Sequence, residues 1–256
     1  MGKNAFKEAI QAGRQQLGLW SMLRDPALTE MLGQCGYDWI NIDCEHTPNS
    51  EADVLAMLQA LSGCPTEAMV RPSCLDVAQI KRLLDIGART LVIPYVQTVA
   101  EAELAAAAVA YPPAGIRGVS SVARAARYGA DQGYFARARE DICLIVQIET
   151  REALDNLEAI AAVPGIDGLF VGPADMAASM GYPGNPRHPE VQAAILDATR
   201  RIRAAGKPAG FLSPDQELLG LVVDAGCVFT AVDIDLAIVR RGALSRLDAC
   251  KHWRGG

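Results

Sequence analysis

The chain has 256 residues, of which 50% are hydrophobic and 21% charged, with 24 Lys and Arg against 30 Asp and Glu and a formal net charge of −6. This composition is too apolar for a disordered chain, and every apolar run is interrupted before the roughly 18 residues that a membrane span needs. The acidic balance also argues against nucleic acid as a partner.

Seven cysteines and three histidines limit the redox state and the metal chemistry. No two cysteines form a C-x-x-C pair, and most lie in apolar segments, so we expect buried, reduced thiols in a cytoplasmic protein. The first 14 residues are charged and lack the apolar core of a signal peptide, which agrees with that expectation. A zinc site is not expected, because no histidine is spaced with a cysteine as a ligand set.

Short strand-like runs alternate with longer helical patterns in the first half of the chain. Strands are predicted at residues 16–20, 39–43, 67–71 and 90–96, and helices at 27–35, 51–61, 77–86 and 99–110. The first three helical patterns are followed by Gly36, Gly63 and Gly87, and glycine is the usual residue just past a helix end.

The second half repeats this alternation. Strands are predicted at residues 142–149, 168–172, 208–212 and 228–234, and helices at 151–162, 190–205, 215–225 and 236–249. Eight strand-then-helix units predict an α/β protein with a (β/α)8 TIM barrel as a single domain over residues 1–256, and a doubly wound open sheet is the alternative.

One long connection, residues 113–140, breaks the alternation and contains five arginines. Long connections in compact domains are usually functional or disordered. We expect a surface segment with one short helix, and the alternative is a lid over the site.

Active sites of such barrels lie at the C-terminal ends of the strands, which selects polar residues that directly follow apolar strands. Four predicted strands are followed by such residues, and these should share one rim. They are Asp43, Glu45 and His46; Arg71; Gln147 and Glu149; and Gly172, Pro173, Ala174 and Asp175.

Two carboxylates on this rim have the chemistry of a metal site. Glu149 ends an otherwise apolar run, and a buried acid needs a partner or a cation. Together with Asp175 it makes a hard oxygen site suited to Mg²⁺ or Mn²⁺, with water and substrate completing the coordination. Either carboxylate could instead cap a helix N-terminus.

The other rim residues suggest proton transfer and anion binding. His46 lies just past a strand, three residues after Asp43, and is better placed for proton transfer than the other two histidines. Arg71 could point across the barrel mouth or pair with a rim carboxylate. Residues 172–175 could present backbone N–H groups at a helix start, which suits a substrate carboxylate.

Several absent motifs narrow the chemistry further. Neither glycine-rich phosphate-binding motif is present, and there is no G-x-S-x-G nucleophile motif. Lys81 lies within a helical pattern and Lys207 just before a strand, so neither is placed at the C-terminal end of a strand. A Schiff-base lysine is therefore not expected, which favours a metal as the electron sink.

Five stretches resemble a known family. They are residues 38–49 (DWINIDCEHTPN), 70–73 (VRPS), 111–119 (YPPAGIRGV), 146–150 (VQIET) and 172–175 (GPAD). They resemble the HpcH/HpaI aldolase family, especially its 4-hydroxy-2-oxoheptanedioate and 2-keto-3-deoxy sugar acid aldolases. The resemblance runs over nearly the whole chain in the same order.

The resemblance implies a class II pyruvate aldolase that joins pyruvate or hydroxypyruvate to an aldehyde, or cleaves the resulting 4-hydroxy-2-oxo acid. It implies a divalent metal (Mg²⁺, Mn²⁺ or Co²⁺), no organic cofactor, and a homohexamer built as a trimer of dimers with the last helix exchanged between subunits.

The resemblance also assigns roles to individual residues. Glu149 and Asp175 match the metal ligands, Arg71 the residue beside the enolate, and His46 the general base, with Asp43 as its orienting partner. Asp85 matches an acid that reaches a neighbouring subunit's site. The matching substrate-binding positions are Arg71, Gln147, Gly172, Pro173, Ala174 and Asp175, and the aldehyde is expected near Leu212 and Ser213.

Two other functions remain open at this point. The same enolate chemistry would serve an oxaloacetate decarboxylase or a citrate-lyase-like acyl-CoA lyase, and the arginines of residues 117–139 could supply a nucleotide pocket for the latter. A barrel retained only for binding or assembly is the non-enzymatic alternative.

Overall fold

Eight parallel strands close into a barrel, each hydrogen-bonded to the next and the last to the first, in a computed structural model that describes residues 3–254. The strands are β1 (Gln16–Ser21), β2 (Trp39–Asp43), β3 (Glu67–Arg71), β4 (Thr90–Ile93), β5 (Cys143–Ile148), β6 (Gly168–Val171), β7 (Ala209–Leu212) and β8 (Phe229–Ile234). The predicted (β/α)8 barrel is confirmed, and the open-sheet alternative is wrong.

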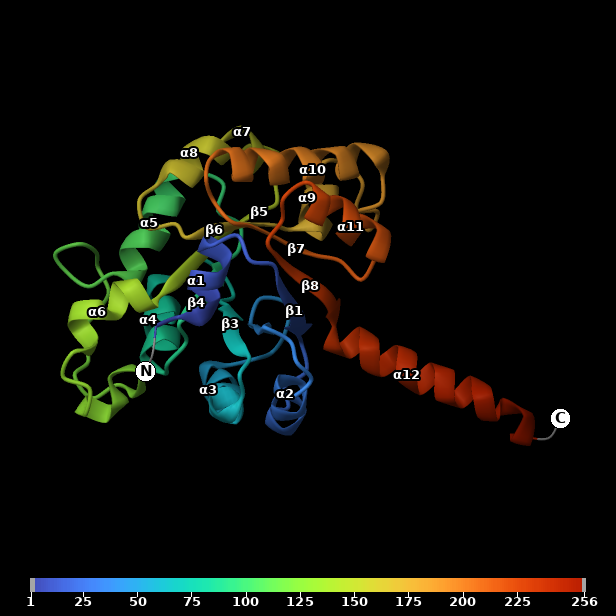
Figure 1. Cartoon of the computed structure of the whole chain (residues 1–256), viewed down its shortest axis with the longest axis horizontal. Helices are drawn as coiled ribbons and strands as arrows, with labels where there is room; N and C mark the ends of the chain where they lie inside the picture. Colours follow the sequence, from blue (N-terminus) through green and yellow to red (C-terminus); the bar gives the residue numbers. More distant parts are fainter. Residues whose placement is uncertain (1–2, 255–256) are drawn as a thin grey trace.

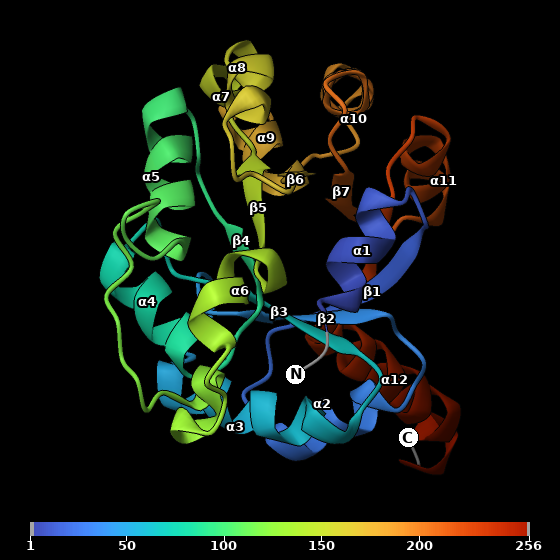
Figure 2. The same cartoon turned by 60° about the vertical axis from the view of Figure 1, so that its left-hand side comes forward.

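Helices surround the strands, as Figures 1 and 2 show. They are α2 (Pro26–Gly33), α3 (Glu51–Ala60), α4 (Val77–Asp85), α5 (Val99–Val109), α7 (Arg151–Asp155), α8 (Leu157–Ala162), α9 (Pro173–Ser179), α10 (Pro189–Ala204) and α11 (Gln216–Asp224), while α12 (Asp235–Cys250) extends away from the barrel. A large apolar core that includes Ile42, Val70, Leu91 and Leu144 fills the space between strands and helices. Because both faces of the parallel sheet are covered, most residues of its strands are apolar.

The inside of the barrel holds a second core of aromatic and aliphatic side chains. Trp39, Phe170 and Phe229 are fully or almost fully buried there. Helix α1 (Ala5–Gln11), which we did not predict, adds Phe6 and Ile10 to this core. Buried polar side chains lie at both ends of the strands: Thr90, at the start of β4, accepts from the side chain of Asn4, and Asp43 and Arg71 lie at the C-terminal ends of β2 and β3.

Two predicted elements have different bounds in the structure. Strand β4 ends at Ile93 and not at residue 96, because Pro94 cannot donate a hydrogen bond and Tyr95 has a φ of 53°. The helix predicted at 151–162 is divided into α7 and α8 at Asn156, whose side chain donates to the carbonyl oxygen of Gln97.

The connection at residues 113–140 packs beside the barrel. It contains a short 3-10 segment, Arg124–Gly129, and most of helix α6 (Tyr134–Asp141), so it has two helical pieces where we expected one. Arg117 is fully buried and donates to Asp85 at 2.7 Å, and Arg124 donates to the carbonyl oxygen of Ile86. Since a helix that follows a strand runs back antiparallel to it, the end of α4 lies near the N-terminal ends of the strands. The segment is attached at the end of the barrel opposite to the C-terminal ends of the strands. It therefore does not form a lid over the predicted site of its own chain.

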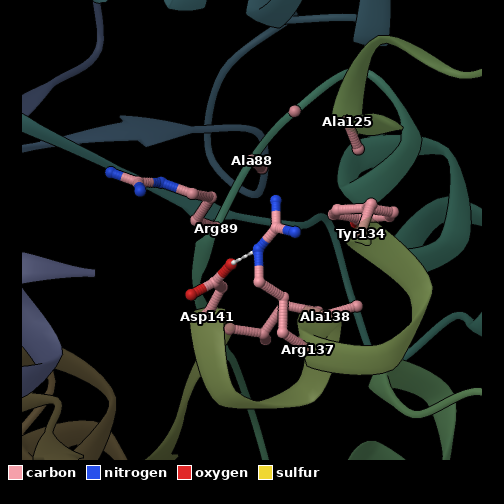
Figure 3. A pocket seen from close by; sticks show the side chains of 9 residues that line it. Ala88, Arg89, Ala125, Tyr134, Arg137, Ala138 and Asp141 are labelled. Carbon is pink, nitrogen blue, oxygen red and sulfur yellow. Dashed lines mark ion pairs between the residues drawn. The ribbon is translucent and has the colours of Figure 1, made fainter. Parts of the chain in front are cut away.

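A small hollow under α6 is too small for a substrate. Figure 3 shows its lining, which includes Tyr134 and Arg137, the latter paired with Asp141 at 3.3 Å. Its volume of about 10 Å³ has room for about one water molecule. None of the helices within residues 3–254 has the length and apolar character required to cross a membrane.

Candidate active site

A cavity of about 240 Å³ opens at the C-terminal ends of the strands. One part of its lining is apolar and comes from Trp20, Met22, Phe170, Leu212 and Ile234. The other part is polar or belongs to the turn after β6, and comes from His46, Arg71, Gln147, Glu149, Gly172, Pro173, Ala174 and Asp175. The structure thus brings the rim residues of four strands to one cavity.

Arg71 is held by Asp43 at the ends of two adjacent strands. The two residues are partners in the β2–β3 register, so their side chains leave the sheet on the same face. Nε donates to one oxygen of Asp43 at 2.7 Å and Nη2 to the other at 2.8 Å. Both side chains are buried, and this two-point geometry fixes the guanidinium plane.

Further contacts orient the rest of the guanidinium. Nη1 lies 2.7 Å from Glu45 and donates to Gln147 at 3.4 Å, and the group stacks 4.8 Å from the centre of the Trp20 ring. Burial acts against the charge of Arg71, but the hydrogen bonds and charge of Asp43 outweigh it and raise the pKa of Arg71. Burial likewise acts to raise the pKa of Asp43, but Arg71 prevails and lowers it. Both groups therefore stay charged.

Glu149 is a buried carboxylate with two hydrogen-bond donors. One oxygen accepts from the backbone N–H of Tyr95 at 2.7 Å, and the other from Nε2 of Gln147 at 2.6 Å. A Cβ on Gly172 would lie 2.3 Å from this second oxygen, so the close packing depends on a glycine there. Burial, partly opposed by the Tyr95 N–H, and the charges of Glu45 and Asp175 raise the pKa of Glu149 to about 7.

Asp175 is the third residue of helix α9 and is partly exposed at the cavity wall. Its Oδ1 accepts from the hydroxyl of Tyr95 at 3.0 Å. Helix α9 begins directly after β6 at Gly172, so the Gly-Pro-Ala-Asp segment starts a helix as expected.

His46 stands on a loop that is tied to the end of β2. The side chains of Thr47 and Asn49 both donate to the carbonyl oxygen of Asp43, and the N–H of Glu45 donates to its carboxylate. The His46 side chain is 55% exposed, and its Nε2 lies 3.9 Å from Glu45. We expected Asp43 to orient His46, but both oxygens of Asp43 accept from Arg71. In this chain the acid next to His46 is Glu45.

Besides Asp43, which contacts Arg71, two predicted residues lie outside the cavity lining. Ser213 is buried, donates its N–H to Ala231 and accepts from the N–H of Asp215. Asp85 ends α4 near the opposite end of the barrel and is paired with Arg117, so only a site in another subunit could receive it. Leu212 does line the cavity.

The carboxylates fit a divalent cation of the Mg²⁺ type. Glu149 is 1% exposed; its burial and the charges of two neighbouring carboxylates raise its pKa, and a cation would relieve both the burial cost and the repulsion. Among residues 3–254 no three His, Cys, Asp or Glu side chains are gathered as a ligand set. A cation here would have Glu149 and Asp175 as protein ligands and take its other ligands from water and substrate, as Mg²⁺ commonly does.

Four of the five arginines of residues 117–139 are bound to other groups of the chain. Arg117 pairs with Asp85, Arg124 with a backbone carbonyl, Arg137 with Asp131 and Asp141, and Arg139 with Asp167. These contacts occupy them away from the cavity, so this part of the reasoning for an acyl-CoA lyase is not supported.

Sequence reasoning missed several cavity residues. Trp20 and Ile234 lie at or near the C-terminal ends of β1 and β8, where active sites of such barrels lie. We considered only polar, glycine and proline residues at these strand ends, so these two were not selected. Glu45 was noted on the rim without a role. No sequence pattern marks Tyr95 as a site residue, because its contacts form only when the loops after β4, β5 and β6 meet in the folded chain.

Comparisons with known proteins agree over nearly the whole chain. The model of the HpcH/HpaI aldolase/citrate lyase family matches residues 16–241. A hydroxypyruvate/pyruvate aldolase of Sagittula stellata is 53% identical, covering 95% of this chain and 96% of that protein. A 4-hydroxy-2-oxo-heptane-1,7-dioate aldolase of Salmonella dublin is 52% identical over 99% and 98%. The crystal structure of a family protein from Burkholderia cenocepacia J2315 has a TM-score of 0.94 at 35% identity, covering 97% of this chain and all of that one.

Proposed function

Because this chain belongs to the HpcH/HpaI aldolase/citrate lyase family, we propose that it is a divalent-metal-dependent aldolase that makes or cleaves 4-hydroxy-2-oxo acids. Its relatives are aldolases, and the chain is a carbon–carbon lyase acting on small molecules. The observation that carries the proposal is that Glu149, Asp175, Arg71 and His46 line one cavity. Pyruvate or hydroxypyruvate is the proposed donor and an aldehyde the acceptor.

Glu149 and Asp175 would hold the cation, which we expect to be Mg²⁺, Mn²⁺ or Co²⁺. When bound, it supplies positive charge beside the oxygens of the keto acid, which favours formation of the enolate. No organic cofactor is required by this chemistry.

The residues of the chain act on the substrate around this point. Arg71 places a fixed positive charge in the cavity, where negative charge develops on the enolate oxygen. In cleavage His46, on the open side, takes the proton of the C4 hydroxyl while the C3–C4 bond breaks to give the aldehyde and the enolate, and the same proton can then be returned to C3 to give pyruvate; synthesis is the reverse. The N-terminal end of α9 and Gln147 are placed to bind the keto acid, and the apolar wall with Leu212 receives the aldehyde.

Removing divalent metal should abolish pyruvate release from a 4-hydroxy-2-oxo acid. We expect a loss of at least about 100-fold after dialysis against a chelator, because a catalytic cation contributes several kcal/mol, and recovery on adding Mn²⁺, Mg²⁺ or Co²⁺. The coupled assay should include oxaloacetate and a malyl-CoA as competing substrates. Full aldol cleavage by metal-free protein would contradict the proposal, and faster turnover of oxaloacetate or malyl-CoA would replace it by one of the alternatives.

The last helix supports a further part of the proposal, a homohexamer in which α12 packs against another subunit. Figure 1 shows α12 extending away from the barrel towards the C-terminus. Leu236, Val239, Leu244 and Leu247 on this helix are exposed in the single chain, which is unusual for a helix of a monomer. Sedimentation equilibrium should give about six times the 27.2 kDa of one chain, and Leu244→Glu should lower that mass. A wild-type monomer would contradict the assembly.

A further inference from the structure

The short loop between β4 and α5 brings Tyr95 to the two carboxylates of the proposed metal site. Its backbone φ is 53°, in the left-handed region that side chains with a Cβ adopt reluctantly. Glycine would adopt this conformation without penalty. The backbone conformation at this position would favour glycine, but the residue is tyrosine. The contacts of its side chain therefore need an explanation.

Tyr95 is bonded to both carboxylates, by two different groups. Its backbone N–H donates to Oε1 of Glu149 at 2.7 Å, and its hydroxyl donates to Oδ1 of Asp175 at 3.0 Å. Within residues 3–254 this hydroxyl is the one hydrogen-bond donor that the Asp175 carboxylate has. The left-handed turn is what allows one residue to direct its N–H to one acid and its ring to the other.

The loop that carries Tyr95 is fixed on both sides. Val96, the next residue, is fully buried. The side chain of Gln97 accepts from Thr150, which directly follows Glu149, and the carbonyl oxygen of Gln97 accepts from Asn156. Tyr95 is thus attached to the β5–α7 turn, and its position relative to Glu149 is set by several hydrogen bonds.

We propose that Tyr95 is a positioning residue of the metal site, whose hydroxyl fixes Asp175 so that both carboxylates face the same point. This inference rests on the proposed function. Asp175 is partly exposed and gains rotational freedom without the hydroxyl, whereas Glu149 keeps both of its donors. Hydrogen-bond partners of metal ligands typically change metal affinity by 10- to 100-fold.

The test measures Mn²⁺ binding by calorimetry or by the spin-resonance signal of free Mn²⁺, independently of turnover. For Tyr95→Phe we expect a Kd about ten-fold higher, unchanged thermal unfolding, and a kcat within about two-fold of wild type once Mn²⁺ is saturating. Tyr95→Gly keeps the N–H to Glu149 and removes the unfavourable φ, so it should bind Mn²⁺ as weakly as Tyr95→Phe without loss of stability. Agreement of the two variants assigns the effect to the hydroxyl and not to a disturbed fold.

Tyr128→Phe is the matched control. Tyr128 is also an exposed tyrosine with a positive φ, of 57°, but lies in the segment beside α4. Its variant should bind Mn²⁺ like the wild type, and an equal loss there would overturn the inference. A Kd for Tyr95→Phe equal to or lower than that of the wild type would also overturn the inference. If Glu149→Gln no longer bound Mn²⁺ in that case, the proposed function would still stand. Absence of Mn²⁺ binding by the wild type would overturn both.

Discussion

Replacing Glu149 by glutamine is expected to lower pyruvate release at saturating substrate by at least about 10³-fold, because a cation that contributes several kcal/mol to catalysis is lost with its ligand. Glutamine has the same shape but carries no charge. Its amide nitrogen must also face either the Tyr95 N–H or the Gln147 amide nitrogen, both of which are donors. The measurement is kcat together with the Mn²⁺ Kd.

The control for this variant is Glu158→Gln. Glu158 is a glutamate on the outer surface, paired with Arg201, and it takes no part in the cavity. Its loss should leave kcat and the Mn²⁺ Kd unchanged. If Glu149→Gln kept more than a tenth of the wild-type kcat with Mn²⁺ bound, Glu149 could not be the essential ligand.

The role of Glu149 should also be visible in the pH dependence of Mn²⁺ binding. The pKa of Glu149 is about 7 in the chain without a cation, so below pH 7 the acid is protonated and must release its proton before a cation binds. The apparent Mn²⁺ affinity of the wild type should then fall about ten-fold per pH unit below 7 and level off above it. Glu149→Gln should abolish this slope in whatever weak binding remains.

Arg71→Lys is expected to lower kcat/KM by about 10²- to 10³-fold while the protein stays folded. Lysine keeps the positive charge but cannot bond both oxygens of Asp43 and at the same time lie along Glu45 and over Trp20. A charge that is no longer fixed stabilises the enolate less, and loss of one such preorganised group costs about this much. Steady-state kinetics with saturating metal measures the effect.

Arg82→Lys provides the comparison. Arg82 is exposed and paired with Glu51 on the surface, so its replacement should change neither kinetics nor stability. If Arg71→Lys retained wild-type kcat/KM, the guanidinium geometry would be unimportant and the role of Arg71 would reduce to its charge.

The strands could be predicted from the sequence because each is a short apolar run that ends in a turn or a polar residue. The predicted bounds of the second and third strands agree with β2 and β3, and the fourth was too long, since the apolar Val96 continues the pattern past Pro94 although its backbone has left the sheet. Helix α1 is too short for a periodic signal and owes its place to Phe6 and Ile10 in the barrel interior.

The site was predictable as a set of residues but not as a set of contacts. The strand-end rule selects Arg71 and Asp43 separately, but that they bond each other depends on the β2–β3 register, which only the closed barrel defines. The contacts of Tyr95 depend in the same way on where the loops after β4, β5 and β6 meet.

The charges around the cavity determine the order in which the cation and the keto acid should bind. Four carboxylates, those of Asp43, Glu45, Glu149 and Asp175, stand in or beside it against the guanidinium of Arg71. An anionic keto acid entering before any cation meets net repulsion, so productive association should be sequential, with the cation first and the acid second. Because such coupling is reciprocal, a bound keto acid should in turn slow the departure of the cation.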